Sequence, residues 1–184
     1  MKGNLFMKKV IAIFLAALMA ISFAACNKAD DNNNSSEDSN ISMTLEEIIN
    51  AVYEKNPVDL SLETSSIDIS DADMLKAFTG LDSADKVQEV SVSEPMMSSQ
   101  AYSFVLIRVK NAADAEEVAS AVLDGINPRK WVCVEADDVR VMVKGDVVAL
   151  YMVDSQLGEE ISGDSVEKAF TEVAGGSLDK VIKK

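Results

Sequence analysis

The segment from residue 139 to residue 153 constrains the fold most, because it reads as a complete β-hairpin. Valine alternates with other residues over 139–144, and an uninterrupted apolar run follows over 147–153. Between them lies the dipeptide Gly145-Asp146, which favours a two-residue turn between antiparallel strands. The sequence therefore predicts an antiparallel sheet in this part of the chain.

A second pair of strands is predicted over 86–93 and 101–110. Residues 101–110 are apolar on both alternating faces, so we expect a central strand that is covered on one face and partly shielded on the other. Residues 131–135 could add a short strand. Residues 60–69 mix Ser and Thr with apolar residues and read as a loop with extended pieces.

Four helices are expected from capping and periodicity. Thr44 and Glu47 have the spacing of a capping box, and the helix they open should run to about Lys55, before Asn56-Pro57. A second helix over 71–78 begins after Ser70 and ends at Gly80. A third follows Asn111 or Asp114 and carries an apolar stripe that consists of Ala115, Val118, Ala119, Val122 and Ile126. The last covers 162–174.

The predicted order of elements is α-α-β-β-α-β-β-α, with no evident internal repeat. Hairpins that surround a helix argue for an α+β domain. We expect a four- to five-stranded antiparallel sheet with helices packed mainly on one face.

The first 25 residues resemble a bacterial secretion leader. Residues 1–9 carry lysines, 10–21 are apolar, and 22–25 are mostly small. The apolar core is shorter than the roughly 20 residues of a membrane-spanning helix. Either Met1 or Met7 could be the initiator. The stretch Phe23-Ala24-Ala25-Cys26 resembles a lipobox, with Phe23 where an aliphatic residue is usual.

This resemblance predicts cleavage before Cys26 and a lipid, typically palmitate, on that cysteine. An uncleaved anchor and an ordinary signal peptide cut near Ala25 are the alternatives. Residues 26–41 are rich in Asn, Ser and Asp, which predicts a disordered tether. We expect residues 42–184 to form one domain at the extracytoplasmic face of the cell membrane.

The formal charge of the whole chain is −14, and Lys2, Lys8 and Lys9 are the only charges before Cys26. The chain from Cys26 onward therefore stands at −17, a surface that repels nucleic acid and anionic lipid. With Cys26 lipidated, Cys133 has no partner for a disulfide. An exported domain without a disulfide favours a Gram-positive source.

Histidine is absent, which removes Ser-His-Asp triads, Cys-His dyads and His-based zinc sites. Cys133 lies in the apolar stretch 131–134, so we expect a structural, partly buried thiol. The pairs Ser83/Lys86 and Ser165/Lys168 have the Ser-x-x-Lys spacing of serine acylases. Neither is accompanied by Lys-Thr-Gly or Ser-Asp-Asn, so we expect chance matches.

Acidic groups could bind calcium at Asp68, Asp71 and Asp73 or at the adjacent pair Asp137-Asp138. An EF-hand loop that began at Asp68 would need Gly at its sixth position and Glu at its twelfth, but the chain has Asp73 and Thr79 there. Helix capping therefore explains these acids better. A carboxylate pair of the glycosidase kind cannot be identified from sequence.

The methionines could form a soft-metal site, but their spacing is irregular and favours core packing; they are Met96, Met97, Met142 and Met152. Trp131 and Tyr102 could be binding aromatics, with core packing the more common use. We therefore assign no catalytic residue, no metal ligand and no cofactor.

The chain from about residue 43 to 153 resembles a family of bacterial lipoproteins, the domain of unknown function 4358. The resemblance rests on the leader and tether, residues 43–49, residues 87–93, the strand 104–110 with the following 114–118, and the hairpin around Gly145. It implies an exported, membrane-tethered protein and no functional residue.

We expect a non-enzymatic module anchored to the membrane through lipid on Cys26. Its partner would be an envelope protein, a wall polymer or a small ligand, and not nucleic acid. Two alternatives stay open: a small cell-envelope hydrolase that uses carboxylates or Ser/Lys, and an accessory subunit of a membrane complex.

Overall fold

The computed structural model describes residues 40–184, which fold around one six-stranded antiparallel sheet. Its strands are β1 (Leu62–Ser66), β2 (Val87–Pro95), β3 (Tyr102–Val109), β4 (Asp138–Lys144), β5 (Val147–Val153) and β6 (Lys180–Lys183). Their order across the sheet is β1-β2-β3-β5-β4-β6. The α+β class and the antiparallel sheet are therefore as predicted, although the sheet has more strands than the four or five expected.

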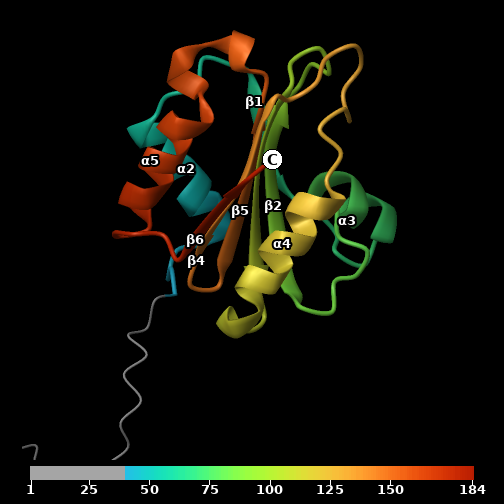
Figure 1. Cartoon of the computed structure of the whole chain (residues 1–184), viewed down its shortest axis with the longest axis vertical. Helices are drawn as coiled ribbons and strands as arrows, with labels where there is room; N and C mark the ends of the chain where they lie inside the picture. Colours follow the sequence, from blue (N-terminus) through green and yellow to red (C-terminus); the bar gives the residue numbers. More distant parts are fainter. Residues whose placement is uncertain (1–39) are drawn as a thin grey trace, which may run out of the picture. The chain divides into compact units, whose positions relative to one another are not determined.

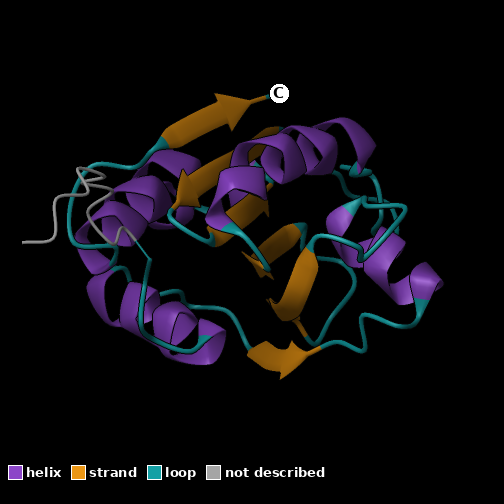
Figure 2. Cartoon of the chain, turned by 90° about the horizontal axis from the view of Figure 1, so that it is seen from below, coloured by secondary structure: helices purple, strands orange, loops and turns teal. Residues whose placement is uncertain are grey.

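Helices cover both faces of this sheet, which corrects the prediction of one covered face. Helices α2 (Leu45–Lys55) and α5 (Gly163–Val173) lie side by side on one face, and α3 (Ala72–Thr79) and α4 (Ala115–Gly125) lie on the other. Figure 1 shows these three layers with the sheet nearly edge-on. Seen from below in Figure 2, the strands form a row with helices on either side.

The reason is the composition of the two central strands. Every residue of β3 and β5 is buried, and their apolar side chains point alternately to the two faces. One core therefore lies under α3 and α4, with Val105, Ile107 and Leu150 among its members. The other lies under α2 and α5 and includes Phe104 and Tyr151. A single layer of helices would leave half of this apolar surface in water.

Strand β1 lies within residues 60–69, where the sequence predicts a loop with extended pieces, and β6 was not predicted; the two form the edges of the sheet. β1 reads Leu-Glu-Thr-Ser-Ser and pairs with β2 from Leu62↔Pro95 to Ser66↔Ser91. β6 is four residues long and pairs with β4. Residues 131–135, by contrast, form an irregular loop and not a strand, so the observed order of elements matches the predicted one only in part.

Local capping explains where the helices begin and end. At α2, Thr44 accepts a hydrogen bond from the Glu47 amide and Glu47 accepts one from the Thr44 amide, so the capping box is confirmed. Helix α3 is capped by Asp71 instead of Ser70, because the Asp71 carboxylate accepts from the amides of residues 73 and 74. Its predicted end at Gly80 is confirmed, with φ of +77°.

The other two helices also follow the predicted pattern. Asn111 caps a short 3₁₀ turn, Ala112–Asp114, that leads into α4, and Asp114 makes no capping hydrogen bond. The predicted stripe of α4 is buried, as is Ile126. The Ser162 hydroxyl caps α5 by accepting from the amide of Ser165.

Candidate functional site

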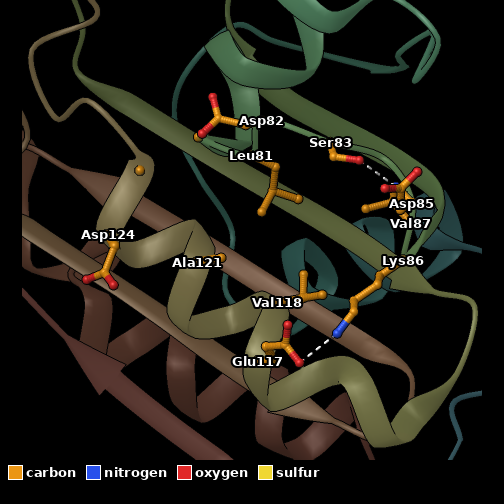
Figure 3. A pocket seen from close by; sticks show the side chains of 12 residues that line it. Leu81, Asp82, Ser83, Asp85, Lys86, Val87, Glu117, Val118, Ala121 and Asp124 are labelled. Carbon is orange, nitrogen blue, oxygen red and sulfur yellow. Dashed lines mark hydrogen bonds and ion pairs between the residues drawn. The ribbon is translucent and has the colours of Figure 1, made fainter.

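The face of the sheet covered by α3 and α4 carries the two main hollows of the described residues. The first, which we call the α4 groove, lies between the segment 80–87 and α4 and has a volume of about 500 Å³ (Figure 3). It is lined by Gly80, Leu81, Asp82, Ser83, Asp85, Lys86, Val87, Glu117, Val118, Ala121, Asp124 and Gly125. A volume of this size suits a small ligand or a few residues of a peptide.

The α4 groove combines an apolar middle with acidic ends. In Figure 3, the side chains of Leu81, Val118 and Ala121 lie between Asp124 at one end and Asp85 at the other. Lys86 is held by ion pairs to Glu117 and to Asp114, the latter at 3.0 Å. These hydrogen bonds raise the pKa of the Lys86 ammonium, so it stays charged and remains paired with the two acids.

The second hollow, which we call the Trp131 pocket, has a volume of about 640 Å³. It is lined by Lys76, Ala77, Phe78, Glu94, Pro95, Met96, Ser98, Gly125, Asn127, Lys130, Trp131 and Val132. Gly125 lines both hollows, so they adjoin at the end of α4. The Trp131 pocket draws its walls from α3, the end of β2 and the loop after α4.

Lys130 is the one ammonium group in the described residues that lies over aromatic rings. Its Nζ is 5.1 Å from the ring centre of Phe78 and 5.2 Å from that of Trp131. It also pairs with the Glu94 carboxylate. Burial lowers the pKa of Lys130, and the contact with Glu94 opposes this shift.

Ser103 completes a small polar cluster with Lys130 and Glu94. Its hydroxyl donates to Glu94 at 2.6 Å, and the Lys130 ammonium lies 3.3 Å from the same hydroxyl oxygen. A nucleophilic serine would need a neutral lysine to accept its proton and a route to substrate. Ser103 instead donates its hydrogen bond to Glu94 and has no exposed surface, so this geometry stabilises the end of the sheet.

Exposed apolar side chains gather around the mouth of the Trp131 pocket. Among residues 40–184, the large hydrophobic side chains that stand in solvent are Met74, Met96, Met97 and Val132. Met96 and Val132 line the pocket with exposures of 74% and 67%, and Met97 follows Met96 with 60%. Single exposed apolar residues are ordinary, but a cluster beside a pocket marks an interaction surface.

The predicted site residue Cys26 lies outside the described residues, so its lipidation stays a prediction. Cys133 is described, and it corrects the prediction of a partly buried thiol: it is exposed and has a φ of +65°. The reason is that the apolar stretch 131–134 forms a loop whose backbone turns Cys133 outward, while Trp131 packs against the core.

The two Ser-x-x-Lys pairs do not form catalytic dyads. The Ser83 hydroxyl accepts from the amide of Asp85, while Lys86 is engaged by acids of the α4 region. On α5, the Ser165 hydroxyl donates to the carbonyl of Glu159, and its oxygen lies 3.0 Å from the hydroxyl oxygen of Ser162. Both serines therefore have local structural partners.

The grouped acids also serve local structure. Asp68 accepts from the amide and hydroxyl of Ser70, and Asp71 caps α3. Asp137 accepts from the amide and hydroxyl of Ser155, each at 2.7 Å. Within residues 40–184, no set of three or more His, Cys, Asp or Glu side chains is placed to hold a metal ion.

Asp138 belongs to a different cluster, centred on the buried guanidinium of Arg140. Arg140 donates to both oxygens of Asp138 at 3.0 and 2.6 Å, and to Asp164 and Glu167 at 2.8 and 2.7 Å. These contacts hold the start of α5 against β4.

The methionines and aromatic residues considered as binding residues also lie in different parts of the domain. Met142 and Met152 are buried in cores on opposite faces of the sheet, whereas Met96 is exposed, so the three do not form one site. Tyr102 is buried, and its hydroxyl donates to that of Tyr53 at 3.1 Å. Trp131 packs against the core with one part and lines the pocket with another.

Sequence reasoning missed Lys130, Glu94 and Ser103, which come from three separate segments. It also missed the α4 groove. Nothing in the local sequence brings these residues together, because the pairing of β2 with β3 and the loop after α4 do so.

No family model, no curated protein and no solved structure matches the chain. The resemblance to the lipoprotein family therefore stays a prediction. Among the described residues, none of the helices has both the length and the apolar character needed to cross a membrane.

Proposed function

We propose that the chain is a lipid-anchored extracytoplasmic binding module. Cys26 would carry the lipid, residues 27–40 would form the tether, and the following α+β domain would meet a partner in the envelope of a Gram-positive cell. The support for the anchor is the order of leader, lipobox-like stretch and polar tether. Under this proposal the membrane is the first partner.

The anchor is tested by labelling cells with a radioactive fatty acid. We expect label on the wild-type chain and no label on Cys26→Ala. Cys133→Ala is the matched control, because it removes the only other cysteine and should keep the label. Label that persists in Cys26→Ala would overturn the anchor.

The observation that carries the binding role is the exposure of Met96 and Val132 in the lining of the Trp131 pocket, with the exposed Met97 next to Met96 in the chain. Leaving these side chains in water costs free energy that a partner would recover by covering them. Methionine adapts to different partner surfaces because its side chain is unbranched and polarisable. A protein partner, including a subunit of a membrane complex, fits such a surface better than a wall polymer of hydroxyl groups.

The binding role is tested by quantitative affinity purification of the tethered chain from cross-linked membranes. We expect Met96→Ser/Val132→Ser to lose at least one protein that the wild-type chain recovers. Met74→Ser is the control, since Met74 is also an exposed methionine but lines neither hollow. Equal recovery of every protein by all three chains would contradict the proposal.

A further inference from the structure

The α4 groove is built from an apolar strip with an excess of negative charge around it. Leu81 and Val118 are buried and form the floor, and Ala121 extends it along α4. The lining includes four carboxylates, of which Asp82 pairs with Lys76 and Glu117 with Lys86, while the other two have no ion pair within residues 40–184. A ligand that matches this surface therefore joins apolar groups to positive charge.

The single cation of the lining does not cancel the acids. Lys86 is shared between Glu117 and Asp114, and Asp114 stands outside the groove. Asp85 and Asp124 form no ion pair within residues 40–184, and both are exposed. Figure 3 places them at opposite ends of the apolar strip, so each end offers a carboxylate to a ligand.

The groove also continues toward the Trp131 pocket, since Gly125 lines both. An extended ligand can therefore reach from the carboxylates to the exposed Met96 and Val132. A free small amine would use one end only, and an anionic lipid surface would be repelled by the acids.

We infer that the α4 groove binds a basic, apolar peptide segment of the partner protein. The methylene groups of a lysine or arginine would lie on Leu81 and Val118, with the cation at Asp85 or Asp124. The inference rests on the proposed binding function and adds the chemical class of the partner. It predicts that binding weakens as salt rises, because exposed charge pairs are screened.

The probe is an acetylated and amidated hexapeptide of alternating lysine and leucine, titrated into the ¹⁵N-labelled exported domain. We expect chemical-shift changes that concentrate in residues 81–87 and 117–125. Asp85→Asn/Asp124→Asn should weaken the Kd about fivefold, since each exposed pair supplies a modest part of the affinity. Neither side chain makes a hydrogen bond within residues 40–184, so this variant should keep the fold.

Glu54→Gln/Asp59→Asn is the matched control. It changes the net charge equally but alters exposed acids on and after α2, on the other face of the sheet. An unchanged Kd in this control and a weaker one in the groove variant support the inference. Equal weakening in both would show attraction to net charge alone and would overturn it.

Two further probes identify the class of ligand. The same peptide with glutamate in place of lysine should not bind, and equal binding would overturn the inference. If 1,5-diaminopentane binds as tightly as the peptide, the groove is a site for free amines and the peptide assignment is wrong. Either result would overturn the peptide assignment alone. The proposed binding function would still be supported if Met96→Ser/Val132→Ser loses its protein partner.

Discussion

Gly80 and Gly125 pack backbone against backbone: a Cβ atom built on Gly80 would lie 2.5 Å from the carbonyl carbon of Gly125. This approach joins the end of α3 to the end of α4, where the α4 groove and the Trp131 pocket adjoin. The two glycines therefore fix the geometry of both hollows.

We predict that Gly80→Ala destabilises the domain more than Gly175→Ala. The two glycines have φ of +77° and +78°, so both substitutions carry the same backbone strain, but a Cβ on Gly175 meets nothing within 4 Å. The additional cost at Gly80 should be about 2 kcal/mol of unfolding free energy, measured by urea denaturation. Equal losses of unfolding free energy in the two variants would show that the close approach of Gly80 to Gly125 adds nothing to the cost of the substitution.

Arg140→Met should destabilise the domain, since it leaves the Asp138 carboxylate without its bidentate partner. Arg140 is only 4% exposed, but its acidic partners are in part solvated, so the loss should be about 2 kcal/mol. Arg129→Met is the control because Arg129 forms an exposed pair with Glu135. It should change the unfolding free energy by less than about 0.5 kcal/mol. A small effect of Arg140→Met would refute a structural role for the cluster.

Asp137 should make stability sensitive to acid. The hydroxyl and amide of Ser155 lower the pKa of Asp137 below its ordinary value, so the stabilisation is complete above about pH 4 and is lost as pH falls through the lowered pKa. We expect Ser155→Ala to raise this pKa, as followed by NMR of the carboxyl carbon. Ser177→Ala, an exposed serine elsewhere, should not. An unchanged titration in Ser155→Ala would disprove the assignment.

Cys133 should react rapidly with a thiol reagent in the folded domain, because its side chain is exposed. In the Cys26→Ala chain it is the sole cysteine, so the absorbance of the released thiolate reports it alone. The rate should equal that of the same chain unfolded in urea, and Cys133→Ser should show no reaction. A rate many times slower when folded would instead support the burial that the sequence suggested.

The elements with strong local signals were predictable from sequence. The capping box at Thr44 and Glu47, the cap at Gly80 and the hairpin around Gly145 depend on residues close together in the chain. Edge strand β1 has no apolar alternation, and it becomes a strand because β2 supplies its hydrogen-bonding partner. Such long-range pairing leaves no local trace.

The sequence of β3 also carries the signal for the second covered face. Both faces of residues 101–110 are apolar, and this pattern requires helices on either side. The candidate site was less accessible to such reasoning. Met96 and Trp131 can be singled out by residue type, whereas their proximity to Lys130 depends on three segments that are distant in sequence.

We propose that the side of the sheet covered by α3 and α4 receives a protein partner. The most direct test of this proposal is a photo-reactive amino acid placed at Val132 in the full, tethered chain and activated in intact cells. We predict one discrete adduct from position 132 that is lost in the Gly80→Ala background, and none from Glu54 on α2. The same adduct from both positions, or none from position 132, would contradict the claim.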